Sequence, residues 1–190
     1  HFGNWEIFPV GCGLLRYPFT GVARPHANEW IYRDVLRTRQ ATGVEILDKK
    51  HIAHDVLKRL RAGGMVGFVG DQYAGSQALF VEFFGELAST SAAMATFARK
   101  TGAAIIPAFD HINVDGTHTP IIHPPLRVAR SENPADDIAA ATQALMRILE
   151  QEIRAAPTMY VWAHRKWRPR RHTPGQGVPR MAVHCTPEAS

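Results

Sequence analysis

The sequence predicts an α/β domain in which a largely parallel mixed sheet is flanked by helices. Two observations carry this prediction: short apolar runs that end in glycine-containing turns, and intervening segments whose apolar residues recur at helical spacing. Strands that alternate with helices favour parallel pairing, because a crossover helix connects each strand to the next. The chain has 190 residues, 45% of them hydrophobic and 21% charged, which are the size and composition of one globular domain.

The first half of the chain contains two predicted helices. Asn28 is a suitable N-cap for a helix over 28–42, and Gly43 follows it as a C-terminal stop. The second helix covers 51–62 and meets the pair Gly63-Gly64. The predicted strands of this half are 20–24, 44–47 and 65–69.

The strand over 65–69 is a continuous apolar run that leads directly into Gly70-Asp71-Gln72. Such a run is typical of a strand that is buried on both faces. Ligands of parallel sheets bind beyond the carboxyl ends of the strands. We therefore expect a functional site at Asp71 and in the segment around His1.

The second half of the chain continues the alternation. An apolar stretch over 79–84 precedes a predicted helix over 90–101, with Thr90 or Ser91 as its cap and Gly102 as its stop. Strands are predicted over 103–109 and 119–123, and an amphipathic helix that begins with proline over 134–155. Residues 169–190, which contain Pro, Gly and Arg, are predicted to be a tail that need not be ordered, so the domain covers 1–168.

The composition excludes several classes of protein. Two cysteines exclude a disulfide scaffold and a four-cysteine zinc site, and the ten histidines form no HExxH or Cys/His ligand pattern, so no metal is expected. The net charge of +5 comes from a single segment over 165–171, which holds five basic residues and no acidic one. Without those five, the other 17 basic residues equal the 17 acidic residues in number.

The first six residues, HFGNWE, contain a candidate catalytic pair. His1 and Glu6 can meet if the histidine lies in a loop before a helix and the glutamate in the first turn, with Gly3 allowing the tight entry and Asn4 as a cap. Glu6 would then accept a hydrogen bond from Nδ1 of His1 and leave Nε2 free as a general base. With the nucleophile supplied by a substrate hydroxyl, this chemistry is acyl transfer. A histidine and a glutamate at this spacing also occur by chance.

This opening block resembles that of the lysophospholipid acyltransferase superfamily, in which His is followed after four residues by Asp or Glu. Its Gly-Asn-Trp-Glu form resembles the lipid A biosynthesis acyltransferases, of the lauroyl or myristoyl transferase type, in particular. The resemblance covers about residues 1–168, although Glu82 stands where the family commonly has proline. Further blocks follow in the family's order: RPHAN at 24–28, RQATG at 39–43, GDQ at 70–72, EFFG at 82–85, the helix, turn and strand over 90–107, and WAHRKW at 162–167.

The resemblance implies an activity and a set of site residues. The chain would move a fatty acyl group from acyl carrier protein, or from acyl-CoA, onto a hydroxyl of a lipid A precursor or a related glycolipid, with no further cofactor. His1 would be the general base and Glu6 its orienting partner. The matched blocks suggest substrate-binding roles for Asn4, Arg24, Arg39, Asp71, Gln72 and Arg165.

The resemblance also implies a location, at the cytoplasmic face of the bacterial inner membrane. The chain begins at His1, and the family's membrane anchor and first strand are absent, so we expect an N-terminally truncated chain with the anchor upstream. From the residues alone, Asp71 positions a sugar hydroxyl, forms a salt bridge with Arg39, or is an ordinary turn aspartate.

The basic segment 165–171 has several interpretations. It contacts the anionic membrane surface, phosphates of the acceptor, the acidic carrier protein or nucleic acid, or it is a solvated tail. Trp162 and Trp167 favour a membrane or headgroup contact, since tryptophan is enriched at membrane interfaces. Two functional alternatives to the enzyme remain: an inactive acyltransferase-like module that binds anionic lipid, and a nucleic-acid binder. No stacking motif or recognition helix supports the latter, so no nucleic acid partner is expected.

Overall fold

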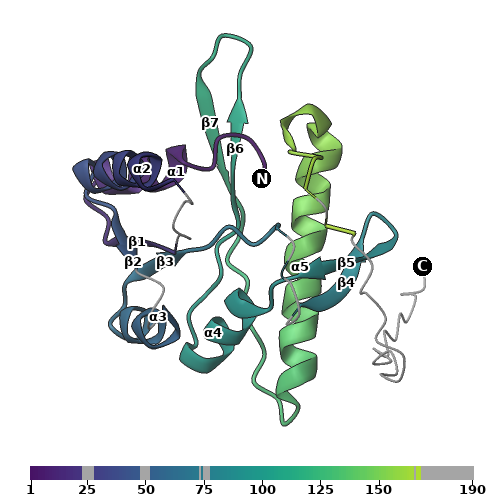
Figure 1. Cartoon of the computed structure of the whole chain (residues 1–190). Coiled ribbons are helices and arrows are strands. Elements are labelled where there is room, and N and C mark those ends of the chain that lie inside the picture. The colour runs from purple at the N-terminus through teal and green to yellow at the C-terminus, as the bar shows by residue number, and fades with distance from the viewer. Residues whose placement is uncertain (23–27, 48–51, 73, 75–77, 165, 168–190) are drawn as a thin grey trace.

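A computed structural model describes residues 1–22, 28–47, 52–72, 74, 78–164 and 166–167. A parallel sheet has the strand order β2-β1-β3 and is formed by β1 (Phe19–Val22), β2 (Glu45–Leu47) and β3 (Met65–Gly67). Helices α1 (Ile7–Leu14) and α2 (Glu29–Ala41) lie at one end of this layer and α3 (Ile52–Arg61) at the other (Figure 1). The predicted α/β class is confirmed.

The caps of α2 explain why its boundaries are predictable. The side chain of Asn28 accepts hydrogen bonds from the backbone N–H groups of Trp30 and Ile31, at 3.0 and 3.3 Å. These bonds satisfy donors that have no partner within the helix. At the other end, Gly43 has φ of +86°, a conformation that glycine adopts without strain.

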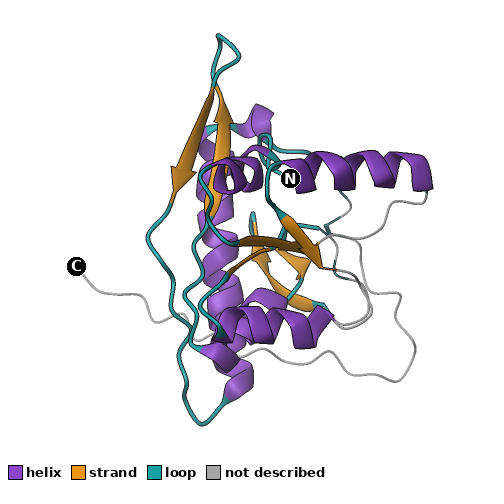
Figure 2. Cartoon of the chain, turned by 90° about the vertical axis from the view of Figure 1, so that its left-hand side faces the viewer, coloured by secondary structure: helices purple, strands orange, loops and turns teal. Residues whose placement is uncertain are grey.

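The second half of the chain packs around one long helix, α5 (Pro134–Ala155). An antiparallel pair formed by β4 (Leu79–Phe83) and β5 (Glu86–Thr90) lies against α5, and the hairpin of β6 (Ala108–Ile112) and β7 (His118–Ile122) rises beside it (Figure 1). Helix α4 (Ala93–Thr101) and the 3-10 helix η3 (Pro157–Met159) complete the fold. Figure 2, viewed from the side of the parallel sheet, shows α5 standing behind that sheet.

The main apolar core lies between α5 and the β4–β5 pair. This core joins the start of the chain to the segment after η3, because Phe2 and Tyr160 are both part of it. Its buried members are Phe2, Val81, Phe83, Ala88, Met146, Leu149, Ile153 and Tyr160.

The structure differs from the sequence-based expectation in the second half. The strands form one parallel sheet and two antiparallel pairs rather than a single mixed sheet. Thr90 and Ser91 do not begin the helix: Thr90 is the last residue of β5, and α4 starts at Ala93. The strand predicted over 103–109 starts later, at Ala108, because the preceding residues make only an isolated bridge between Ile105 and Leu126.

Membrane-spanning character was also assessed. Within the described residues, no helix combines the length and the apolar character that a membrane crossing needs. The predicted tail over 169–190 lies outside the described residues, so the predicted domain boundary stays a prediction.

A buried ion pair ties α5 to α4. Asp137, in the first turn of α5, accepts hydrogen bonds from Arg99 Nε at 2.8 Å and from the backbone and hydroxyl of Ser131 at 2.9 and 2.8 Å. The bond from Arg99, together with those from Ser131, holds the pKa of Asp137 below its ordinary value, although burial opposes them. The charged carboxylate therefore stabilises the folded state.

We expect Asp137→Ala to lower the melting temperature by about 5 °C or more at pH 7, because it leaves Arg99 and Ser131 without their acceptor. The carboxylate contributes fully above its unfolded pKa of about 4, and this contribution is lost as the pH falls through the lower folded pKa. Thermal unfolding followed by circular dichroism should therefore show a difference that narrows below about pH 4. Glu132→Ala, which removes an exposed carboxylate just before α5, is the matched control. Equal losses in the two variants would contradict this account.

Candidate active site

Residues 1–3 are held in place by the segment that follows η3. Gly3 donates its backbone N–H to Met159 O at 2.9 Å, and Val161 donates to His1 O at the same distance. These bonds form an antiparallel bridge between Phe2 and Tyr160, and the Phe2 side chain is buried in the core. His1 therefore lies at the boundary between the core and the parallel sheet.

Gly3 and Asn4 join this segment to β6. Gly3 has φ of +54°, and a Cβ atom there would lie 1.8 Å from the backbone oxygen of Asp110. The Asn4 N–H donates to Asp110 Oδ2 at 3.0 Å, and the same oxygen accepts from His118 Nδ1 at 2.7 Å. Only glycine permits so close an approach of two backbones.

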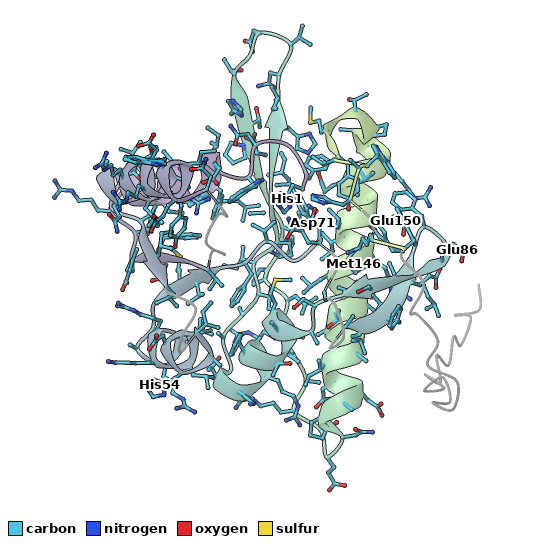
Figure 3. All side chains as sticks on the ribbon, in the orientation of Figure 1. His1, His54, Asp71, Glu86, Met146 and Glu150 are labelled. Carbon is cyan, nitrogen blue, oxygen red and sulfur yellow. The ribbon has the colours of Figure 1, made fainter. Side chains whose placement is uncertain are left out.

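Asp71 is the hydrogen-bond partner of His1. Nδ1 of His1 lies 2.7 Å from Asp71 Oδ1, and Nε2 lies 3.1 Å from the Gln72 side-chain amide nitrogen. Figure 3 shows His1 and Asp71 side by side in the middle of the molecule, near the carboxyl end of β3. A carboxylate can only accept, so Nδ1 carries the proton and Nε2 is the basic nitrogen.

Glu6 has a different partner from the expected one. Its carboxylate binds the guanidinium of Arg39 through two contacts, Nε to Oε2 at 3.0 Å and a second from Nη2 to Oε1. The predicted hydrogen bond from His1 Nδ1 to Glu6 is therefore wrong, because Asp71 occupies that position. The alternative in which Asp71 forms a salt bridge with Arg39 is also wrong, because the guanidinium of Arg39 binds Glu6 instead.

Aromatic rings lie around the contact of His1 with Asp71 and the contact of Glu6 with Arg39. The Trp5 ring lies 5.4 Å from the His1 ring and 5.4 Å from the Arg39 guanidinium, in a cation–π arrangement. The His164 ring lies edge-on to His1 at 5.0 Å. Apolar surroundings strengthen charge interactions by excluding water.

One residue of the basic segment is far from solvent. Lys166 is fully buried, and its Nζ donates to the backbone oxygen of Asp71 at 3.1 Å. The predicted contact of this residue with a membrane or headgroup is therefore wrong. Trp167 likewise packs inward, stacked on Phe83 at 5.4 Å. The other residues of 165–171 lie outside the described residues.

Ionisation of Lys166 is perturbed by its environment. Burial lowers its pKa to about 8, although the negative charge of Asp71 opposes part of the shift. Burial and the same negative charge raise the pKa of Tyr160 well above the ordinary tyrosine value. In both groups burial is the larger cause of the shift and the charge of Asp71 the smaller one.

The structure thus brings together five of the predicted site residues: His1, Asn4 and Glu6 at the start of the chain, and Asp71 and Gln72 after β3. Arg39 joins them from α2 through Glu6. Asn4 Oδ1 accepts from the Glu6 N–H at 3.3 Å, but the N-cap of α1 is Glu6, so the predicted cap at Asn4 is wrong. Arg24 and Arg165 lie outside the described residues.

The sequence analysis missed the roles of Lys166 and Asp110. Lys166 stands in a run of basic residues that are predicted to be exposed, and Trp167 beside it was the one local indication of burial. Asp110 sits in an apolar strand, where a buried carboxylate is unusual. Among the residues that the structure describes, no group of three His, Cys, Asp or Glu side chains is arranged to hold a metal ion.

The residues of this site lie within a segment that matches a known protein family. The model of the bacterial lipid A biosynthesis acyltransferases matches residues 1–169, which include every described residue of the site. The chain belongs to this family. The resemblance predicted from the sequence blocks is confirmed.

Curated relatives of this family are similar to the chain over most of its length. A lipid A biosynthesis lauroyltransferase of Escherichia coli is 30% identical over 94% of the chain and 56% of its own length. A lipid A biosynthesis acyltransferase of Haemophilus influenzae is 28% identical over 84% of the chain and 49% of its own length. A phosphatidylinositol mannoside acyltransferase of Mycolicibacterium smegmatis is 28% identical over 88% of the chain. The chain thus spans about half the length of these relatives.

We expect Gly3→Ala to displace His1 in this family member. The added Cβ would meet the Asp110 backbone and impose a left-handed conformation on alanine, at a combined cost of about 3 kcal/mol in the free energy of unfolding. Chemical denaturation measures this loss. Gly11→Ala is the control, since nothing lies within 4 Å of that position in α1, and helix propensity predicts a gain of up to about 1 kcal/mol. Equal stability of the two variants would show that the close approach at Gly3 is unimportant.

Proposed function

We propose that the chain provides the catalytic site of an acyltransferase that moves a fatty acyl group from a thioester to a hydroxyl of a lipid A precursor or a related glycolipid. The observation that carries the proposal is the 2.7 Å contact between His1 Nδ1 and Asp71 Oδ1, which leaves Nε2 as a base. Family membership and the names of the relatives support the reaction class. The donor is acyl carrier protein or acyl-CoA, with no further cofactor.

The geometry of His1 suits general base catalysis. Nε2 takes the proton of the acceptor hydroxyl as its oxygen attacks the thioester carbonyl. The protonated imidazole then returns this proton to the departing thiol, so the ester C–O bond forms and the C–S bond breaks with no net change in protonation. Asp71 stabilises the charged imidazole between these steps, as a buried carboxylate does in hydrolase triads.

Arg39 is positioned to bind an anionic group. Glu6 holds its guanidinium through Nε and Nη2, and Trp5 lies against it. An arginine has five N–H donors in a planar fork, so this pairing leaves donors for a phosphate of the acceptor or for the developing oxyanion. In this proposal Glu6 acts through Arg39, and Asp71 acts through His1.

The proposed setting of the reaction is the cytoplasmic face of the bacterial inner membrane, where glycolipid acceptors are found. Acyl carrier protein, the glycolipid and the membrane surface are the proposed partners. Trp162, which is about half exposed, remains available for contact with a lipid interface, whereas Lys166 does not.

We expect His1→Ala to reduce acyl transfer by about 10²- to 10⁴-fold, which is the range for loss of a general base. Asp71→Asn should cause a loss of the same order, because an amide can present its N–H to Nδ1 and select the wrong tautomer. Transfer of radiolabelled acyl groups from acyl carrier protein to glycolipid acceptors measures both. His54→Ala, at an exposed position on α3 far from the site in Figure 3, is the matched control.

The outcomes separate the candidate functions. Full transfer by His1→Ala would refute the mechanism. Binding of anionic vesicles with no transfer by the unmodified protein would instead indicate an inactive lipid-binding module. Glu6→Gln tests the division of roles: it should weaken acceptor binding through Arg39 and raise KM, whereas Asp71→Asn should lower kcat.

A further inference from the structure

Lys166 is the most unusual residue of the described structure. Its side chain is fully buried, and lysine is almost never fully buried unless its charge is compensated. The proposed acyl transfer described above gives it no role. A methionine or leucine would fill the same volume without the cost of removing an ammonium group from water. The presence of a charge here therefore calls for an explanation.

The surroundings of Lys166 direct its ammonium group toward Asp71. Nζ donates to Asp71 O at 3.1 Å and lies 5.3 Å from the ring centre of Phe83. The backbone is fixed on both sides: Ser89 N–H donates to Lys166 O at 3.2 Å, and Trp167 Nε1 donates to Phe83 O at 3.3 Å. The side chain thus leaves a rigid support, formed by β4 and β5, and ends at the residue that binds His1.

We propose that Lys166 is a positioning residue for the general base: its ammonium group fixes the Asp71 backbone and places a buried positive charge beside the residue that orients His1. This inference rests on the proposed function, since it concerns the same site. It assigns to the closing WAHRKW block a role inside the active site rather than at the surface.

Two further observations support a role for charge rather than for packing alone. The Asp71 carboxylate is itself buried, so a nearby positive charge acts on it with little screening by water. Asp71 acts in the reverse direction on Lys166, where it opposes the fall in pKa that burial causes. The negative charge of Asp71 therefore favours the charged form of Lys166.

The other titratable groups around this pair come from different segments. His1 contacts Asp71 directly, and His164 lies beside His1. Tyr160 is close enough for the charge of Asp71 to raise its pKa, so the phenol stays neutral over the working range of pH. The α-amino group of His1 also contacts the Asp71 carboxylate, so Lys166 is one of two cationic groups beside Asp71, and its own pKa lies at about 8.

The test compares three variants of Lys166 across pH. Lys166→Gln keeps a hydrogen-bond donor but no charge, Lys166→Met removes both, and Lys166→Arg keeps a charge that persists to high pH. We expect transfer at pH 7 to fall about 10- to 100-fold in the Gln and Met variants, as for a displaced catalytic group, and to stay within about tenfold of wild type in the Arg variant. Lys100→Met, at an exposed position of α4, is the control.

The pH profile gives the readout that a purely structural role would not change. In the Gln and Met variants, transfer should not fall near pH 8, because these side chains have no ammonium proton to lose. Above about pH 8 wild-type Lys166 loses its own proton, so the wild-type rate should fall toward that of Lys166→Gln. The Arg variant should show no such alkaline fall.

A parallel measurement keeps the inference testable if the variants fold poorly. In the wild-type protein, an NMR titration of the Lys166 side chain itself, followed at its Cε, should show an inflection near pH 8. Absence of this inflection, or a Gln variant with the wild-type pH profile, would overturn the inference. Loss of transfer in His1→Ala together with such a result would leave the proposed function standing, whereas full transfer in His1→Ala would refute that function instead.

Discussion

The position of the candidate general base depends on one short backbone bridge. Hydrogen bonds from Gly3 to Met159 and from Val161 to His1 attach the first residues to the segment after η3, and the Phe2 side chain anchors that attachment in the core. A histidine carried by an isolated loop would sample many orientations, and holding one orientation has an entropic cost. Packing of Phe2 in the core of α5, β4 and β5 offsets this entropic cost, so the contacts within the site do not have to. The contacts of His1 with Asp71 and Gln72 follow from this placement.

Two carboxylates share the site, and their surroundings assign them different tasks. Asp71 is buried and accepts from an imidazole, so its charge stabilises the protonated base. Glu6 is more exposed and forms a two-point contact with Arg39, so it holds the cation that we propose as the anion-binding group. A single pair of His1 and Glu6 would have to perform both tasks with one carboxylate. Separating them allows the base and the anion-binding group to be adjusted independently.

Local chemistry explains which parts of the fold were predictable. The cap at Asn28, the glycine stops after α2 and α4, and the proline at the start of α5 act within a few residues, so the sequence alone identifies these helices. The division of the strands into one parallel sheet and two antiparallel pairs depends on contacts between distant segments. The motif blocks likewise identified His1, Asp71 and Arg39 as site residues, but their partners could not be read from spacing. A hydrogen bond that joins residues 70 positions apart leaves no local pattern.

The burial of Lys166 shows how a charge run can mislead. Several basic residues in succession are usually solvated, and the excess of positive charge in 165–171 suggested a surface that meets anionic lipid. Lys166 is instead buried beside the Phe83 ring, on which Trp167 stacks, and its ammonium group donates to the backbone oxygen of Asp71. A membrane contact would be served by any cation in this segment, because the attraction depends on charge alone. A buried contact with one carbonyl depends on the length and the direction of one side chain. The same stretch of sequence therefore contains a residue whose side chain reaches an internal carbonyl, that of Asp71.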